Sequence, residues 1–206
     1  MPSQAFGNLS ERMKDIEQLI QAHSALTQFR TARNAAQRAG GSLASISTVV
    51  ARLVKAPGRG RRAEVGAVNR AAIVLLCAHL QGYVEDLHAE AAKALFGNMR
   101  IDVDSLVQYA QDHFSNPHAD RIEQLFWSLG VQRVLEDISW QRTSNRTVRG
   151  RLTGYIRLRN RIAHGSQESV SLAQVRQFKQ FVELFAQRFD ARVHDEIGNI
   201  TGTAPW

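Results

Sequence analysis

The chain has 206 residues, of which 44% are hydrophobic, and this size and composition are typical of one globular domain with a substantial core. Its longest purely apolar run, residues 71–78, is too short to cross a membrane, and the first residues lack the pattern of a signal peptide, so we expect neither secretion nor a membrane partner. The single cysteine, Cys77, excludes an intramolecular disulfide and a cysteine-rich zinc site, and it indicates a reducing, cytoplasmic location.

The net charge of +7 comes mostly from arginine and is spread unevenly along the chain. Residues 1–62 hold 10 bases and 3 acids, whereas residues 63–206 hold 16 of each. Within the second part, seven arginines lie between Asp137 and Glu168 with no acid among them: Arg142, Arg146, Arg149, Arg151, Arg157, Arg159 and Arg161. Two basic islands favour a polyanionic partner, although a solvated charged face would explain either island alone.

Apolar residues recur every three to four positions along almost the whole chain, which predicts helices and an all-α fold. The expected helices cover about residues 8–30, 63–96, 102–115, 118–129, 130–139, 147–164 and 171–196. The helix at 63–96 is apolar nearly all round over its middle, which is typical of a central buried helix.

The segments between and beyond these helices suggest a division of the chain. Residues 1–62 are predicted to form a basic N-terminal helix and a flexible connector, with a short helix at about 43–55 in the connector. Residues 63–198 are predicted to form a helical bundle, and residues 199–206 to form a loose tail.

Several helix ends have suitable capping residues. Asp102 or Asp104 suits the start of the helix at 102–115, and Gly165 suits the end of the helix at 147–164. Ser171 and Gln174 have the spacing of a capping box and predict the start of the last helix.

The remaining aromatic and sulfur-bearing residues are interpreted as structural. Trp127 and Trp140 are expected in the core and Trp206 in the tail, because none of them alternates with basic residues. Cys77 lies in the most apolar segment and is expected to be an inert buried thiol. The chain has neither a Gly-x-Ser-x-Gly frame nor a phosphate-binding loop, which disfavours a serine hydrolase and a P-loop enzyme.

The stretch from Tyr155 to Gly165 combines basic and polar residues on one predicted helix. Arg159 falls near the middle of the apolar face, where a charge is costly to bury without a partner. A structural explanation is that Arg159 pairs with Glu85 or Asp86, tentative supporting acids on the central helix. Asn160 and His164 are four residues apart and lie on one flank, as does Arg157.

The residues Arg159-Asn160-Arg161-Ile162-Ala163-His164 resemble the Arg-x(4–6)-His signature of the HEPN superfamily. The extended stretch Leu158–Gly165 is similar to the RiboL-PSP branch of that superfamily. Further similarity lies in Ala71–Leu87, Ser115–Pro117, Ile122–Gly130 and Asp137–Trp140, and the resemblance covers about residues 63–196.

The resemblance implies a HEPN-like helical bundle, here with additional short helices and an N-terminal helical extension. It implies a metal-independent endoribonuclease that needs no cofactor and whose active site lies between the two copies of a homodimer. Arg159 and His164 would be the catalytic pair, and Asn160 would orient the site. The neighbouring Arg149, Arg157 and Arg161 are predicted to bind the RNA substrate.

The resemblance also bears on biological context. Many HEPN proteins act as toxins or in defence against phage, which implies a possible antitoxin or defence-system partner. Others have lost catalysis, so the alternative function is a non-catalytic module that binds RNA, a nucleotide or a protein.

The chemistry of RNA cleavage suits these residue types. RNA carries its own nucleophile, the 2′-hydroxyl, so the enzyme needs a group that moves protons and a cation that stabilises the phosphorane. Histidine supplies the first and arginine the second. The other histidines do not have the spacing of a His-Glu-x-x-His metal site, and we expect no bound metal.

The spacing of the pair raises a geometric question. Residues five apart on a regular helix point about 140° away from each other, so one straight helix cannot aim both Arg159 and His164 at one phosphate. Either the helix ends before His164, as Gly165 would permit, or a second copy of the chain contributes to the site.

Overall fold

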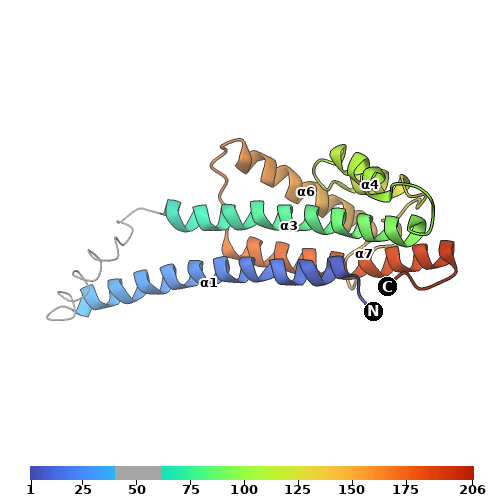
Figure 1. Cartoon of the computed structure of the whole chain (residues 1–206). Helices are drawn as coiled ribbons and strands as arrows, with labels where there is room; N and C mark the ends of the chain where they lie inside the picture. The colour runs from blue at the N-terminus through green and yellow to red at the C-terminus, as the bar shows by residue number, and fades with distance from the viewer. Residues whose placement is uncertain (40–61) are drawn as a thin grey trace.

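The protein is all-α, as predicted. The computed structural model describes residues 1–39 and 62–206, and the predicted short helix at 43–55 lies outside these residues. The described helices are α1 (Gln4–Ala39), α3 (Arg62–Phe96), α4 (Val103–Asp112), α5 (Ala119–Trp127), α6 (Asn145–Ala163) and α7 (Leu172–Thr201) (Figure 1). The structure assigns no strand to the described residues, only an isolated bridge between Trp140 and Thr143.

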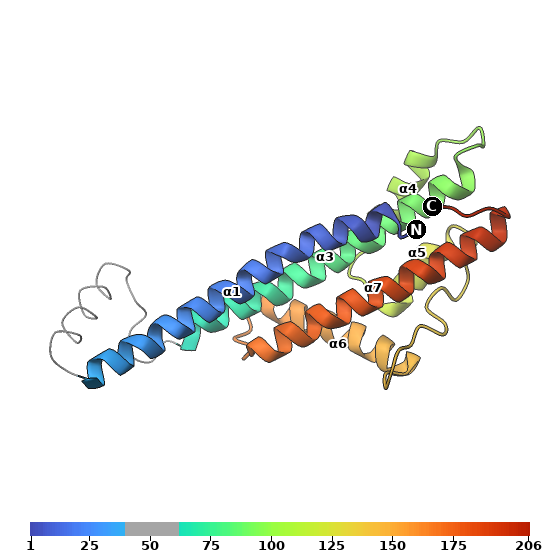
Figure 2. The same ribbon diagram turned by 90° about the horizontal axis from the view of Figure 1, so that it is seen from below.

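The central helix of the bundle is α3, as its apolar sequence predicts. It packs against α1, α4, α5, α6 and α7, while α1, α3 and α7 run as three long rods whose ends bring the two termini of the chain close together (Figures 1 and 2). Among the residues described, Val65–Phe96 is the one helical stretch long and apolar enough to cross a membrane by composition. In this structure it forms the middle of the core, where Leu76, Leu80, Tyr83 and Leu87 are fully buried.

The helix α7 supplies an aromatic spine to this core. Phe181, Phe185 and Phe189 repeat every four residues and stack in sequence, with ring centroids 6.1 and 5.3 Å apart. Tyr83 of α3 donates its hydroxyl hydrogen to the carbonyl of Ala186, at 2.9 Å. The hydrogen bond satisfies the polar end of a buried ring and fixes the register of α3 against α7.

The first helix is longer than predicted. It was expected over 8–30, but α1 begins at Gln4 and continues to Ala39, so residues 31–39 are helical rather than part of a connector. The extension is rich in alanine and arginine, which favour helix, and Gly40 follows it. The side chains of Ala5, Leu9, Met13 and Ile16 are buried in the same core as α3. The predicted division at residue 62 therefore falls between two helices that share one core.

The segment 130–139 is not the predicted short helix but a series of turns. Its apolar residues Val131, Val134, Leu135 and Ile138 have helical spacing and are buried. However, Gly130, Arg133 and Asp137 have φ values of 82°, 51° and 66°, and such left-handed residues interrupt a right-handed helix. The spacing therefore reflects burial of the segment against the core and not its backbone conformation.

One of the three tryptophan predictions is wrong, and the description of the C-terminal segment as loose needs correction. Trp127 is 65% exposed at the end of α5 rather than in the core. Trp140 does pack inward, with its ring 5.6 Å from that of Phe181. The C-terminal segment is not loose: α7 runs to Thr201, and Trp206 packs edge-on against His194 with 5.7 Å between ring centroids.

The predicted helix caps are present. Asp102 begins α4 by accepting a hydrogen bond from the backbone N–H of Ser105, and Ser171 and Gln174 form the capping box of α7. The helix α6 begins at Asn145, two residues before its expected start, because Ser144 caps it.

Candidate active site at the end of helix α6

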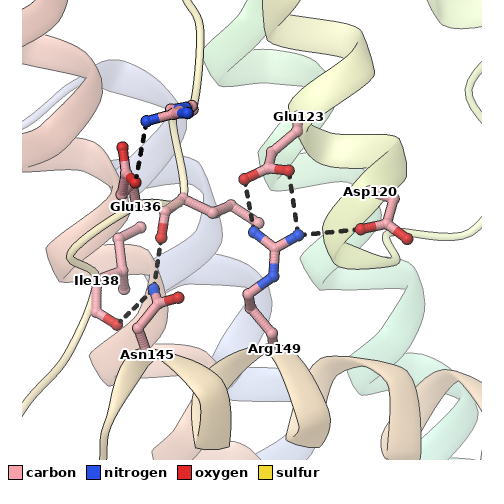
Figure 3. A network of polar contacts seen from close by, with 8 residues as sticks. Asp120, Glu123, Glu136, Ile138, Asn145 and Arg149 are labelled. Atoms are coloured by element: carbon pink, nitrogen blue, oxygen red, sulfur yellow. Dashed lines mark hydrogen bonds and ion pairs between the residues drawn. The ribbon is translucent and has the colours of Figure 1, made fainter.

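The helix α6 is fixed on the bundle by its apolar face and by its first residue. Val148, Leu152 and Ile156 repeat along one side and are buried. The Asn145 amide donates hydrogen bonds to the carbonyls of Leu135, at 2.6 Å, and Ile138, at 3.2 Å (Figure 3). These contacts anchor the start of α6 to the turns of residues 130–139 and set the direction in which its far end points.

At that far end, the guanidinium of Arg159 is held by two side-chain amides. Its Nη1 donates to Oδ1 of Asn116, at 3.0 Å, and to Oδ1 of Asn160, at 3.1 Å. The side chain is half-buried, so these contacts hold the guanidinium in a defined place. Both partners are neutral, so these contacts do not compensate the positive charge of Arg159.

The two acids proposed as partners of Arg159 are engaged elsewhere. Asp86 pairs with Arg12 of α1 at 2.8 Å, and Glu85 accepts a hydrogen bond from Gln81 at 2.9 Å. The reason is the register of α3: Cys77 faces α6, where its Sγ lies 3.8 Å from the carbonyl oxygen of Tyr155. Asp86 follows Cys77 by nine residues and so lies about 180° round the helix, toward α1.

The helix ends directly before His164. The last helical residue is Ala163, His164 is the C-cap, and Gly165 has a φ of 87° that lets the chain turn away. The backbone N–H of His164 still bonds to the carbonyl of Asn160 at 2.9 Å, so this residue keeps the helical register of the Asn160 flank. Helix geometry therefore places Asn160 and His164 on the same flank of α6, and the Arg159 guanidinium reaches the Asn160 side chain.

A family model described as RiboL-PSP-HEPN matches residues 42–195, which is most of the chain and includes this site. The chain belongs to the RiboL-PSP-HEPN family. The match confirms the resemblance found in the sequence, and HEPN domains are typically associated with nucleases and RNA. Searches of curated proteins and of solved structures give no match. The whole of α1 precedes the matched range.

The other arginines predicted to bind substrate differ from Arg159 in their partners. Arg149 makes a two-pronged ion pair with Glu123, at 2.5 and 3.1 Å, and a further bond to Asp120 at 3.0 Å (Figure 3). The hydrogen bond from Arg149 to Glu123 raises the pKa of the guanidinium. The guanidinium therefore ties α5 to α6 and is already occupied by carboxylates.

The remaining two predicted substrate-binding arginines are exposed. Arg161 pairs with Glu168 at 2.6 Å, and this hydrogen bond raises the pKa of the guanidinium. Arg157 has no ion pair with any described residue. It lies near His118, where its charge adds to the effect of burial in lowering the pKa of that imidazole. Since no described carboxylate pairs with it, Arg157 is free to bind a phosphate beside the site.

Two residues beside the candidate site were not assigned to it from the sequence, Asn116 and His118. Asn116 has a φ of 59°, a left-handed conformation that asparagine tolerates better than most residues, and the buried Pro117 follows it. The turn presents the Asn116 amide to Arg159. The Asn-Pro pair is a recognisable turn signal, but which helix the turn faces is decided only by the tertiary packing.

His118 begins α5 beside the same turn. It is half-buried, and burial lowers its pKa, with a further contribution from the positive charge of Arg157. Both effects favour the uncharged imidazole. No side-chain hydrogen bond caps α5 at His118, so the side chain is not committed to a structural role at the helix start.

Cys77 lies beneath the site and has the predicted character. It is 2% exposed, and burial raises the pKa of its thiol to about 12, although the charge of Arg159 opposes this shift. The thiol is therefore protonated and unreactive at neutral pH.

Proposed function

We propose that this HEPN protein is a metal-independent endoribonuclease in which Arg159 and His164 act on one phosphodiester. The observation that carries the proposal is the environment of Arg159: a half-buried guanidinium that is held by two neutral amides and keeps its charge. A structural arginine at such a position would be neutralised by a carboxylate, as Arg149 is. A guanidinium held in place and left charged is suited to bind a phosphate.

In the proposed reaction the RNA supplies the nucleophile. The 2′-hydroxyl attacks the adjacent phosphorus while an imidazole accepts its proton, and the bond from phosphorus to the 5′-oxygen breaks as that oxygen gains a proton. The remaining N–H groups of Arg159 donate to the non-bridging oxygens and stabilise the negative charge of the phosphorane. The products are a 2′,3′-cyclic phosphate and a 5′-hydroxyl.

We infer that the active unit is a homodimer with α6 near its two-fold axis. Two proton transfers occur in the reaction, and each chain brings one His164 to the end of α6. A two-fold axis beside this helix would place two Arg159–His164 pairs round one cleft. We further infer that a cell restrains such a nuclease with an antitoxin or a defence-system partner.

The direct test is cleavage of a labelled single-stranded RNA by the purified protein and by His164→Ala. We expect the wild type to cut in the presence of EDTA, to leave a cyclic phosphate, and to fail when the 2′-hydroxyl at the cut site is replaced by hydrogen. His164→Ala should lose at least about 100-fold in rate, because general acid–base catalysis contributes that much. His194→Ala, a histidine at the other end of α7, is the matched control.

The same assay tests the dimer. Arg159→Ala and His164→Ala chains are inactive alone in this proposal, and mixing them restores activity if one arginine and one histidine from opposite chains suffice. A mixture that stays inactive means that the site needs both residues from one chain or all four from two. A fully active monomer in solution contradicts the shared site.

A non-catalytic RNA-binding module is the second candidate function. It is favoured by one observation: the His164 side chain is exposed and has no hydrogen-bond partner among the described residues that would orient it. Binding of RNA that is lost in Arg159→Ala, without cleavage by the wild type, would establish this alternative. Growth arrest on expression in a bacterial host, relieved by His164→Ala, would instead support a catalytic toxin.

A further inference from the structure

A cavity adjoins α6 on the flank away from Asn160 and His164. It has a volume of about 600 Å³ and lies between α6, α7 and the turn at residues 140–143. Such a volume is within the range of small-molecule sites. Its α6 wall is formed by Arg151 and Tyr155, and Tyr155 precedes Asn160 by five residues, which is about 140° round the helix.

Aromatic packing makes this cavity. The Tyr155 ring stacks on Phe178 of α7, with 3.7 Å between centroids, and lies 5.4 Å from Phe181. These rings stand between the two helices and keep their backbones apart, so that a hollow remains on the solvent side. Tyr155 and Phe181 therefore give the cavity an aromatic part of its lining.

The charge of the cavity has one sign. Its charged lining residues are Arg151 of α6 and Arg188 of α7, and no carboxylate lines it. Both arginines are exposed, and neither forms an ion pair with a described residue. Two exposed guanidiniums that face one hollow, with no carboxylate in its lining, form a site that attracts an anion.

The remaining wall suits a planar heterocycle. Trp140 is half-buried beside Phe181 and is held in a tight turn by paired backbone hydrogen bonds with Thr143, at 3.1 and 2.8 Å. Gln177 and Gln180 line the opposite side with amides that both donate and accept hydrogen bonds. A nucleobase requires both features, an aromatic surface to stack on and amides that match its polar edge.

We propose that this cavity binds one nucleotide unit of an RNA strand, with the phosphate on Arg151 and Arg188 and the base against Trp140. The proposal rests on the proposed function and adds to it a second contact with the same strand. Arg151 precedes Arg159 by eight residues, or about 12 Å along the helix axis. Because Arg151 also lies about 80° round the helix from Arg159, the strand must pass partly round α6, and at about 3.4 Å per stacked nucleotide a connection of at least about four nucleotides is needed.

The experiment measures binding separately from cleavage. Binding of a fluorescent 12-nucleotide single-stranded RNA is titrated in the His164→Ala background, which removes the proposed proton-transfer group. We expect Arg151→Glu and Arg188→Glu each to weaken binding by about ten-fold, as loss of a charged phosphate contact does, and Trp140→Leu to weaken it by a similar factor. Arg100→Glu, at an exposed arginine outside the cavity, makes the same charge change and should bind nearly as the parent does.

Three outcomes decide between the possibilities. Equal weakening by Arg100→Glu, or no weakening by Arg151→Glu and Arg188→Glu, overturns the cavity as an RNA subsite even if the protein cleaves RNA. Calorimetry with adenosine and uridine monophosphates tests whether the ligand is a free nucleotide instead of part of an RNA strand. Tight binding of either monophosphate, together with unchanged RNA affinity in the arginine variants, would overturn the proposal that the cavity binds RNA and would favour a free nucleotide. RNA binding that depends on the cavity arginines, in a protein that does not cleave, supports this inference while the proposed nuclease function fails.

Discussion

Arg149 and Arg159 lie ten residues apart on α6 and are both partly buried, but their hydrogen-bond partners are of opposite kinds. Arg149 forms ion pairs with two carboxylates of α5, which compensate its positive charge. Arg159 meets two amides, which accept hydrogen bonds but carry no charge. The partners therefore support different interpretations: the carboxylates tie Arg149 to another helix, whereas the amides leave the charge of Arg159 uncompensated, as our proposal of a phosphate ligand requires.

The two arrangements also differ in energetic terms. The ion pair of Arg149 is two-pronged, with the planar fork of the guanidinium matched to Glu123, and such geometry makes partly buried pairs stabilising. The Arg159 site retains an uncompensated charge, and a bound phosphate would remove that cost. The start of α6 is thus tied to α5 by an ion pair, and its end is where we propose that a phosphate binds.

The largest expected effect is at Arg159. Arg159→Ala should lower the rate of RNA cleavage by about 100- to 1,000-fold, because it removes donors aimed at the charge that develops in the transition state. Arg159→Lys, which keeps the charge but loses the fork, should recover only part of that loss. Single-turnover cleavage rates measure both, and unfolding curves confirm that the variants are folded. A cleavage rate in Arg159→Ala within a few-fold of wild type would contradict the assignment of this end of α6.

The next largest expected effect concerns the stability of the protein and depends on His88, a buried histidine that contrasts with the exposed His164. It is fully buried, with Nε2 3.2 Å from the Ser128 hydroxyl, and burial lowers its pKa from 6.5 to about 4. The unfolded chain therefore takes up a proton as the pH falls through 6.5, whereas the folded chain does not until about pH 4. The unfolding free energy should fall over this window by about 3 kcal/mol in total.

Denaturant unfolding at a series of pH values measures this dependence. His88→Leu removes the titrating group, and we expect its stability to vary less between pH 6.5 and about 4 than that of the wild type. His113→Leu, at an exposed histidine, is the control and should retain the wild-type slope. An unchanged slope in His88→Leu would assign the acid sensitivity to other groups.

Arg149→Ala should have the opposite effect to Arg159→Ala: it should lower stability and leave cleavage nearly unchanged. Removing the two-pronged pair leaves Glu123 without its partner and should lower the unfolding free energy by about 1–2 kcal/mol, a figure that allows for the solvent exposure of Arg149. Cleavage per folded molecule should change little. Arg133→Ala, which breaks an exposed pair with Glu136 nearby, should cost under about 0.5 kcal/mol (Figure 3). Loss of cleavage with unchanged stability in Arg149→Ala would make this residue part of the substrate site.

Much of the fold followed from the sequence because periodicity reports burial directly. The central position of α3, the capping box at Ser171 and the end of α6 near Gly165 were all predicted from local patterns. The segment 130–139 was mispredicted because its apolar spacing is the same whether a helix or a series of turns buries those side chains. Helical spacing does not distinguish these cases when left-handed residues such as Asp137 are not glycines.

The candidate site was predictable in its α6 residues but not in their partners. Arg159, Asn160 and His164 are close in sequence, so their relation is fixed by helix geometry. Asn116 lies 43 residues away and reaches Arg159 only through the packing of its turn on α6. The same reasoning explains Arg149: its stretch of sequence contains no acid, yet Asp120 and Glu123 lie beside it in space.

The smallest and sharpest test turns the Arg159 arrangement into the Arg149 arrangement. Asn116→Asp replaces an amide by a carboxylate of the same shape, and aspartate tolerates the left-handed backbone at this position, where φ is 59°. The new oxygen would lie about where Oδ1 of Asn116 accepts from Nη1, at 3.0 Å, and would pair with the guanidinium.

If the charge of Arg159 serves a phosphate, neutralising it should lower RNA affinity and cleavage by about ten-fold while the unfolding temperature stays the same or rises. Asn98→Asp makes the same change of net charge at an exposed turn and should leave cleavage unchanged, which separates the local ion pair from the overall loss of positive charge. Normal RNA cleavage by the Asn116→Asp variant would show that the uncompensated charge is not what the site uses. A variant that loses both cleavage and stability would show instead that the Asn116 turn needs its amide for folding. Only a loss of RNA affinity and cleavage without a loss of stability fits the proposal that the charge of Arg159 binds a phosphate.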